Sequence, residues 1–470
     1  MSVRGLRRRR LRRPRPGGVQ AALTEQMVDR LMWRTGFGPS DADRKRWTGK
    51  TLPQVVNQLL KAPQGPFVGD PPLRDKSGLN PHEDDRDLVL AWLDRMVRTR
   101  NPLVERLTFF WHGHFATQRD EVSPPQLMTR QNELFRRYSD LAAFPTANYR
   151  TMVFEVGEDP AMLRFLNGEE STEDRVNENY PREVMELFCL GPLAPNGQPN
   201  YNEADVLELS KALTGWQIDD DNPDQTFGYF NKSRWFSGNK TVLGQTGDYE
   251  HRDAVDVVLK HPSHPQFLMR KLWAEFIPTE PDRATLKELV AVYKKSRFRL
   301  KPVLRKILTH PDMLDSVKEP NMIKPPVVFA VGLMRSLGLT ITDDTLYNSL
   351  NEMGQLPYFP PTVAGWEGGT AWLNTNTALA RFALVNELLD KAYEKSDNTD
   401  DDPDDVVEET AAQAYKRAHE AVGRPWVARG TRSALMYYAN NAPVKRKSDR
   451  VARQRVLRAF MLGGPDAQVM

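Results

Sequence analysis

The segment FFWHGHFATQ, residues 109–118 of the 470-residue chain, contains the two side chains best suited to chemistry, His112 and His114. Neutral imidazole nitrogens are common ligands of Zn, Fe, Mn and Cu, and His-x-His is a spacing that metal sites use. In a regular helix the two side chains would point about 200° apart and could not share an ion. In a strand, or in a turn around Gly113, they would converge, so both interpretations are open.

A metal site needs a third or fourth ligand, and the best oxygen donors lie in VNENYPREVMELFCLG, residues 176–191. Proline suits the first turn of a helix and glycine suits its end, so we expect a helix from Pro181 to Gly191. Glu183 and Glu186 are three residues apart and would share one face of that helix. The segment therefore offers two carboxylates that could act together.

His112, His114, Glu183 and Glu186 thus define a hypothetical site for a divalent metal, of the kind that supports redox or hydrolytic chemistry. The alternative is structural. In it the histidines bind backbone carbonyls beside an aromatic wall, and either glutamate pairs with a nearby arginine. Local His-x-His matches are frequent in proteins that bind no metal, which favours the structural interpretation.

The motif NENY supplies a second group of polar side chains immediately before the expected helix. Free N–H groups gather at a helix start, and side-chain oxygens can cap them. A functional interpretation makes the group a clamp on substrate, with the arginine binding an anion at the helix N-terminus. The structural interpretation, a loop tied down by caps, is the one we favour. The residues concerned are Asn177, Glu178, Asn179 and Arg182.

Several tryptophans stand close to glycines or beside the histidine pair, where they could line a cleft for a sugar or a peptide. They could equally close the core between a helix and a loop, which is the commoner situation because tryptophan is buried on average. The candidates are Trp111, Trp216, Trp366 and Trp372.

The elements that must position these residues are mostly helices. Apolar residues recur at helical spacing through most of the chain, which predicts a mainly α fold, a large multi-helical globular domain with long Pro/Gly-rich loops. Residues 63–84 form such a loop. Residues 217–250 lose helical periodicity and predict at most a small β-hairpin. Residues 325–339 predict a buried helix that is too short to span a membrane.

Charge is distributed unevenly along the chain. Residues 1–16 hold eight arginines and no acid, whereas the whole chain has a net charge of only +3. We expect residues 1–20 to be a disordered Arg-rich tail and residues 21–470 to be a single helical domain. An acidic stretch near 396–410 predicts a disordered insert within it. The body is mildly acidic, so nucleic-acid binding is not indicated.

Several classes of protein are disfavoured by what the sequence lacks. The one cysteine, Cys189, excludes an intramolecular disulfide. The sequence contains no apolar run of about 18 residues, so we expect no transmembrane helix. The arginine-rich start is not followed by an apolar signal core, so the sequence predicts a cytoplasmic location. Serine-hydrolase, P-loop and dinucleotide-binding motifs are also absent from the sequence.

Six phrases occur in the order typical of one family. They are LMWRTGFGPS, NPLVERLTFFWHGHFAT, VNENYPREVMELFCLG, YNEADVLELSKALTGW, HPQFLMRKLWAEFI and LPYFPPTVAGWEGGTAWLNT. Over residues 24–470, with the acidic insert outside the match, the chain resembles the uncharacterised bacterial family numbered 1800 among the domains of unknown function. Six ordered motifs are more specific than any one of them.

The resemblance implies a large, mostly helical protein, and many members look exported. Their genes often neighbour those of a family similar to sulfatases and alkaline phosphatases, which carries a twin-arginine export signal. Two departures from the family pattern stand out. Phe188 stands where a histidine is expected, and Trp235-Phe236 stands where a His-Asp pair is expected. If those positions belong to a family metal site, this chain has lost part of it.

Two functional hypotheses follow, and the sequence does not decide whether the protein is an enzyme. The favoured hypothesis is a helical accessory or scaffold protein that acts with the sulfatase-like partner encoded nearby, exported as a passenger of that partner. The alternative is a metal-dependent enzyme that acts on a polymer or peptide through the His/Glu site.

Overall fold

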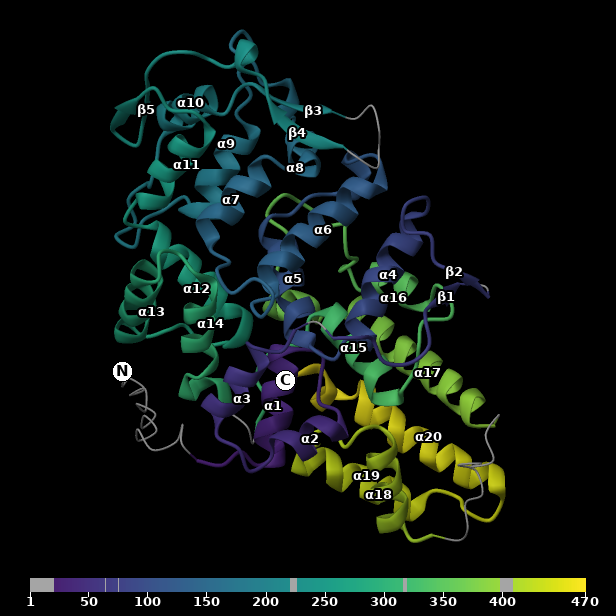
Figure 1. Ribbon diagram of the computed structural model, residues 1–470. Coiled ribbons are helices and arrows are strands. Elements are labelled where there is room, and N and C mark those ends of the chain that lie inside the picture. The colour runs from purple at the N-terminus through teal and green to yellow at the C-terminus, as the bar shows by residue number, and fades with distance from the viewer. Residues whose placement is uncertain (1–20, 64, 75, 220–225, 316–318, 398–408) are drawn as a thin grey trace, which may run out of the picture.

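The computed structural model describes residues 21–63, 65–74, 76–219, 226–315, 319–397 and 409–470, which form a mainly helical structure (Figure 1). The mainly α fold class is therefore confirmed. The Arg-rich tail and most of the acidic insert lie outside the described residues. Among the residues described, no helix is both long and apolar enough to cross a lipid bilayer.

Helices α5 and α6 lie near the middle of the molecule, and α4 lies beside them toward the right of the view (Figure 1). Helix α5 packs against both α4 and α6. The N-terminal part of the chain comprises α1 (Glu25–Thr35), α2 (Asp41–Trp47), α3 (Leu52–Leu59), α4 (Asp85–Arg98), α5 (Pro102–His114) and α6 (Pro125–Ser139).

The middle of the chain forms the upper and left parts of the view in Figure 1. In it α11 packs on α7, and α12 packs on α13 and α14. Its helices are α7 (Tyr149–Gly157), α8 (Pro160–Phe165), α9 (Asn179–Glu183), α10 (Glu203–Ala212), α11 (His251–Lys260), α12 (His264–Phe276), α13 (Arg283–Lys295) and α14 (Leu300–Leu308).

The last part of the chain returns to the N-terminal helices. Helix α15 packs against both α4 and α17, and α20 packs against α17, α18 and α19. The first nine residues of α15 are all buried, which explains the apolar sequence of this helix. The helices of this part are α15 (Pro326–Leu337), α16 (Thr345–Glu352), α17 (Thr375–Asp397), α18 (Ala411–Ala421), α19 (Arg429–Asn441) and α20 (Lys447–Gly463).

In the described residues, β-structure is limited to three two-stranded antiparallel sheets. The aperiodic region 217–250 contains two hairpins. The turn of the second is made by Leu243 and Gly244, both with positive φ (48° and 75°), as a two-residue hairpin loop requires. The strands are β1 (Leu73–Arg74), β2 (Ser77–Gly78), β3 (Trp216–Asp219), β4 (Phe227–Phe230), β5 (Lys240–Val242) and β6 (Gln245–Gly247).

Local capping chemistry determines where several helices begin. Thr24 caps α1 by accepting a hydrogen bond from the N–H of Met27 (3.3 Å). Asn202 caps α10 and forms a capping box with Asp205. One expected start was wrong: the helix assigned to Pro181 begins two residues earlier, at Asn179. Proline is tolerated within the first turn because its missing N–H is not needed there.

The same helix changes register after Glu183, and residues Val184–Cys189 form a π-helix. A π-helix is rare, and its last carbonyl groups, like those of any helix, lack donors within the helix. Here Asn200 donates through Nδ2 to the carbonyl oxygens of Leu190 (3.1 Å) and Gly191 (2.8 Å), just beyond it. The regular helix that we expected from Pro181 to Gly191 is therefore a π-helix over Val184–Cys189. Side chains from elsewhere in the chain hydrogen-bond the carbonyl groups at its end.

A buried ion pair joins the three central helices. The Glu105 carboxylate on α5, which is fully buried, accepts hydrogen bonds from Arg136 Nε on α6 (2.8 Å) and Trp92 Nε1 on α4 (2.9 Å). The guanidinium holds the pKa of Glu105 below its usual value despite the burial. The carboxylate therefore stays charged at neutral pH and ties α4, α5 and α6 together.

We expect Arg136→Met to lower the free energy of unfolding by about 3 kcal/mol or more, because it removes the guanidinium that hydrogen-bonds the buried carboxylate and leaves only the more distant Arg95 (3.6 Å) as its cation. The matched control is Arg137→Met, one residue along the same helix, where the arginine is 52% exposed and pairs with Glu155 at the surface. That change should cost less than about 1 kcal/mol. Urea unfolding of both variants measures the difference, and equal shifts would contradict the structural role of the pair.

Candidate functional site

His112 lies in an aromatic cage near the end of α5 and is buried. Its Nε2 accepts a hydrogen bond from the backbone N–H of Tyr358 (2.9 Å), so in the neutral ring the proton is on Nδ1. The rings of Trp92 and Trp366 lie 5.3 Å and 5.6 Å from the imidazole. Burial lowers the pKa of His112 to about 3, so the ring is neutral at physiological pH.

His114 belongs to a different hydrogen-bonded chain. Tyr149 donates its hydroxyl proton to the carbonyl oxygen of Phe188 (2.5 Å). His114 Nε2, 2.7 Å from the same hydroxyl, must therefore carry a proton and donate it. Its Nδ1 is then the acceptor for Lys271 Nζ (3.3 Å). Burial and the Lys271 charge lower the pKa of His114 well below its usual value.

The glycine between the two histidines does not create a turn, because residues 102–114 are one helix. A Cβ on Gly113 would make only an ordinary contact with the Trp366 ring (3.8 Å). The close approach depends instead on Gly365, which has φ +81° and where a Cβ would lie 2.4 Å from the carbonyl oxygen of Gly113. Gly365 therefore lets the loop that carries Trp366 press against α5. His112 and His114 consequently have separate partners, as a helical HGH segment predicts.

Two side chains of α12 donate hydrogen bonds to carbonyl groups at the end of the π-helix. Lys271 on α12 donates to Leu187 O (2.9 Å). His264 Nδ1 donates to Cys189 O (2.9 Å), and its Nε2 accepts from the Tyr293 hydroxyl (2.9 Å). Burial lowers the pKa of Lys271 to about 8 and that of His264 to about 4. Buried polar groups of this segment are thus paired.

The two candidate glutamates lie at the junction of α9 and the π-helix. Burial, with a smaller contribution from the charge of Glu186, raises the pKa of Glu183, so the two carboxylates influence each other. Glu186 accepts a hydrogen bond from the hydroxyl of Tyr201 (2.8 Å). Within the described ranges, no group of three or more His, Cys, Asp or Glu side chains is arranged to hold a metal ion.

The residues of NENY are occupied with one another and with a neighbouring helix. Arg182 pairs with Glu178 (3.0 Å) and with Glu203 at the start of α10 (2.7 Å). The Asn179 N–H donates to the Asn177 side chain (2.8 Å). The N-cap residue of α9, Glu178, makes no side-chain cap hydrogen bond. An anion at Arg182 would have to compete with two carboxylates.

The four tryptophans proposed as cleft aromatics are distributed through the molecule. Trp111 is fully buried and packs on the Phe115 and Tyr149 rings. Trp366 stacks on Phe109 on the other side of α5 (5.7 Å between centroids). Trp372 is buried at a short 3₁₀ turn. Trp111 thus belongs to the hydrophobic core and Trp366 packs against it, whereas Trp372 is buried outside that cluster.

Trp216, with Asn177, lines a small cavity of about 10 Å³ near the NENY segment. The His251 ring and the hydroxyl of Tyr180 face the same region, since a Cβ on Gly157 would meet both within 2.7 Å. Both ring nitrogens of His251 and the Tyr180 hydroxyl lack a hydrogen-bond partner in the described chain. A cavity of this size suits a single water molecule bound by polar groups.

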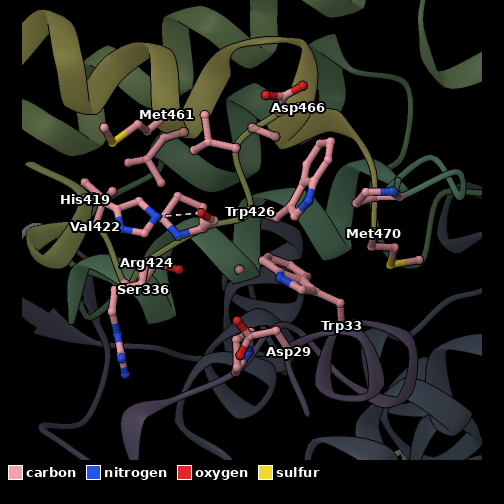
Figure 2. Close-up of a pocket in the computed structure, with 18 of the residues that line it drawn as sticks. Asp29, Trp33, Ser336, His419, Val422, Arg424, Trp426, Met461, Asp466 and Met470 are labelled. Atoms are coloured by element: carbon pink, nitrogen blue, oxygen red, sulfur yellow. Dashed lines mark hydrogen bonds between the residues drawn. The ribbon is translucent and has the colours of Figure 1, made fainter. Parts of the chain in front are cut away.

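A cavity of about 700 Å³ lies elsewhere in the described structure. It is a cleft between α1 and α2, helix α15, and the C-terminal segment that includes α18–α20. Figure 2 shows Trp33 and Trp426 pointing toward its middle, with Asp29 and Asp466 on opposite sides. The imidazole of His419 is held by a hydrogen bond between its Nε2 and the carbonyl oxygen of Pro425 (2.8 Å). We call this cavity the terminal cleft.

A buried lysine stands at the wall of the terminal cleft. Lys324 is 6% exposed, its Nζ donates to the carbonyl oxygen of Ala467 (2.7 Å), and it lies 3.8 Å above the Trp33 ring. Burial, followed by the charges of Arg381 and Arg30, lowers the pKa of Lys324 to about 7. The sequence analysis did not identify this residue. Its one local signal is a lysine that directly precedes an apolar helix.

The described residues form a mainly helical protein with a cleft of ligand size, the terminal cleft. The chain belongs to the family described as "Protein of unknown function (DUF1800)", which matches residues 30–469, as the six ordered motifs predict. Neither a curated protein nor a solved structure matches the chain.

We expect His112→Leu to lower the free energy of unfolding by about 1–3 kcal/mol, because it leaves the buried N–H of Tyr358 without an acceptor. His112→Gln, whose side-chain oxygen can replace Nε2, should cost less. His82→Leu, at an exposed histidine, is the control and should change stability by less than about 0.5 kcal/mol. Denaturant unfolding of the three variants tests this order, and equal losses for Leu and Gln at position 112 would count against it.

Stability should also fall in mild acid because of the buried histidines. His264 is neutral when folded, with a pKa of about 4, and charges more easily when unfolded, near 6.5. Its contribution is therefore complete above pH 6.5 and decreases by about 2 kcal/mol by pH 5. We expect His264→Gln to reduce the loss of stability between pH 7 and pH 5 by about that amount, whereas His82→Gln leaves it unchanged. Unfolding curves at both pH values measure this.

Proposed function

We propose that this protein is a non-catalytic accessory protein, a helical scaffold that binds the sulfatase-like partner encoded nearby. The proposal rests on an exposed apolar surface formed by α17 and α20. Leu379 and Phe382 on α17 are 67% and 36% exposed, and Phe460 on α20 is 47% exposed. The two phenylalanine rings touch edge to face, 6.0 Å apart. We call these three residues the apolar patch.

The exposure of the apolar patch is unusual because its apolar side chains lie together on two packed helices. Leu379 and Phe382 are three residues apart on one helix, so they share a face, and the exposed Ala378 and Ala383 flank them. Single exposed apolar residues are normal, but several in contact on packed helices favour a protein-binding surface. Large aromatic side chains also contribute most to the free energy of association.

The state of the histidines supports a non-catalytic role. A metal binds imidazole through the lone pair of a deprotonated ring nitrogen. In His112 that lone pair accepts the Tyr358 N–H, and in His114 it accepts Lys271. A metal at either ring would have to displace a buried hydrogen bond. The metal-dependent enzyme, acting on a polymer or peptide through His112, His114, Glu183 and Glu186, is therefore the less favoured hypothesis.

Co-expression with the sulfatase-like gene neighbour, followed by capture of either protein, tests the proposal. We expect a stable complex, and we expect Phe382→Ser with Phe460→Ser to weaken it about tenfold or more, the loss typical of aromatic anchor residues. Tyr437→Ser is the matched control, because Tyr437 on α19 is the more exposed side chain (72%) but lies outside the patch. Absence of a complex, or equal weakening by the control, would refute the proposal.

The metal content of the wild-type protein separates the two hypotheses directly. Protein purified without an affinity His-tag should contain no stoichiometric metal by mass spectrometry. A bound metal that disappears in the His112→Ala/His114→Ala double variant, with the fold retained, would instead support the enzyme.

A further inference from the structure

The charged side chains of the terminal cleft are mostly paired. Among the described residues, its lining contains six basic side chains and three acidic ones. Arg44 pairs with Asp29 (2.7 Å), Arg424 pairs with Glu25 (3.4 Å) and with Asp41 outside the lining (2.7 Å), and Lys416 lies 3.9 Å from Glu420. Lys324, in contrast, is not paired with a carboxylate in the described structure.

Lys324 is the most deeply buried of the cations without a carboxylate. In the described structure its Nζ contacts only a carbonyl oxygen and the face of an indole. Trp33 is held in place beneath it by Gly332 of α15, where a Cβ would lie 2.4 Å from the indole ring. An ammonium in this position has lost much of its hydration and has gained no counter-charge. The lowered pKa of Lys324 is the consequence of that environment.

One part of the cleft wall is apolar and adaptable. Trp426, Val422 and three methionines line it, namely Met436, Met461 and Met470. Methionine side chains adjust easily to the shape of an apolar ligand. The volume, about 700 Å³, lies within the range of about 300–1,000 Å³ that small-molecule sites occupy.

We propose that the terminal cleft is a binding site for an amphiphile with an anionic head group, whose charge pairs with Lys324 while its apolar tail lies among the methionines and Trp426. The head group supplies the counter-charge that the lysine lacks, and the tail displaces water from the apolar walls. Pairing with an anion also favours the charged form of the amine, so binding restores a normal protonation state to Lys324. The site is separate from the apolar patch and requires no partner protein.

Calorimetric titration of the wild-type full-length protein with decanoate and with 1-decanol isolates the contribution of the charge, because the tails are nearly identical. We expect decanoate to bind about tenfold or more tightly than decanol, since a charged hydrogen bond in a buried site contributes that much. Acetate, which has the head group without the tail, should show no measurable binding at the same concentrations. No binding of decanoate, or equal binding of decanoate and decanol, would overturn the proposal.

Lys324→Met then assigns the charge to this residue. Methionine keeps much of the side-chain volume, and removal of a buried unpaired charge is tolerated by the fold. We expect the variant to bind decanol as the wild type does and to lose the preference for decanoate. Lys416→Met is the control, because Lys416 lines the same cleft but is 75% exposed and lies 3.9 Å from Glu420.

The control variant should keep the preference for decanoate. A preference that survives Lys324→Met, in protein that melts cooperatively, would show that another cation holds the head group and would overturn the assignment. The ligand comparison in the wild type does not depend on either variant, so a variant that fails to fold leaves the proposal testable. Dodecyl phosphate in place of decanoate distinguishes a phosphate head group from a carboxylate.

Discussion

The need to satisfy the carbonyls of the π-helix Val184–Cys189 organises the centre of this protein. A buried carbonyl without a donor costs about 1–3 kcal/mol, so each one must receive a hydrogen bond from a precisely placed group. The donors come from α7 and α12, through Tyr149, Lys271 and His264. One short segment in an unusual helical register therefore fixes how two distant helices sit against it.

The protonation of the histidines follows from the same constraint. Because the one proton of Tyr149 goes to Phe188 O, His114 must donate to the Tyr149 hydroxyl and accept from Lys271. His112, on the other side of α5, obtains its hydrogen bond from the backbone of Tyr358. The HGH segment looks like a ligand pair in one dimension. In the structure each of the two buried rings has its own hydrogen-bond partners. The buried pair of Glu105 and Arg136 holds the helix that carries both histidines.

Local sequence rules account for much of the fold and for little of the cleft. The caps at Thr24 and Asn202, the helical character of 102–114 and the burial of 326–334 all follow from neighbouring residues. The π-helix does not, and the side chains that hydrogen-bond its last carbonyl groups, Tyr149, Lys271 and His264, are distant from it in the chain. Lys324 escaped prediction for the same reason. Its environment is assembled from Trp33 and Ala467, residues near opposite ends of the sequence.

Helix α20 contributes to both of the proposed binding surfaces. Phe460 points outward into the apolar patch, whereas the next residue, Met461, is buried and lines the terminal cleft. Consecutive residues of a helix point about 100° apart, so Phe460 and Met461 can face different surfaces of the same helix. Any displacement of α20 by a ligand in the cleft would therefore move Phe460. Coupling between two binding equilibria is reciprocal. If a ligand in the cleft changes the affinity of the patch for a partner, the bound partner must change the affinity of the cleft for that ligand by the same factor.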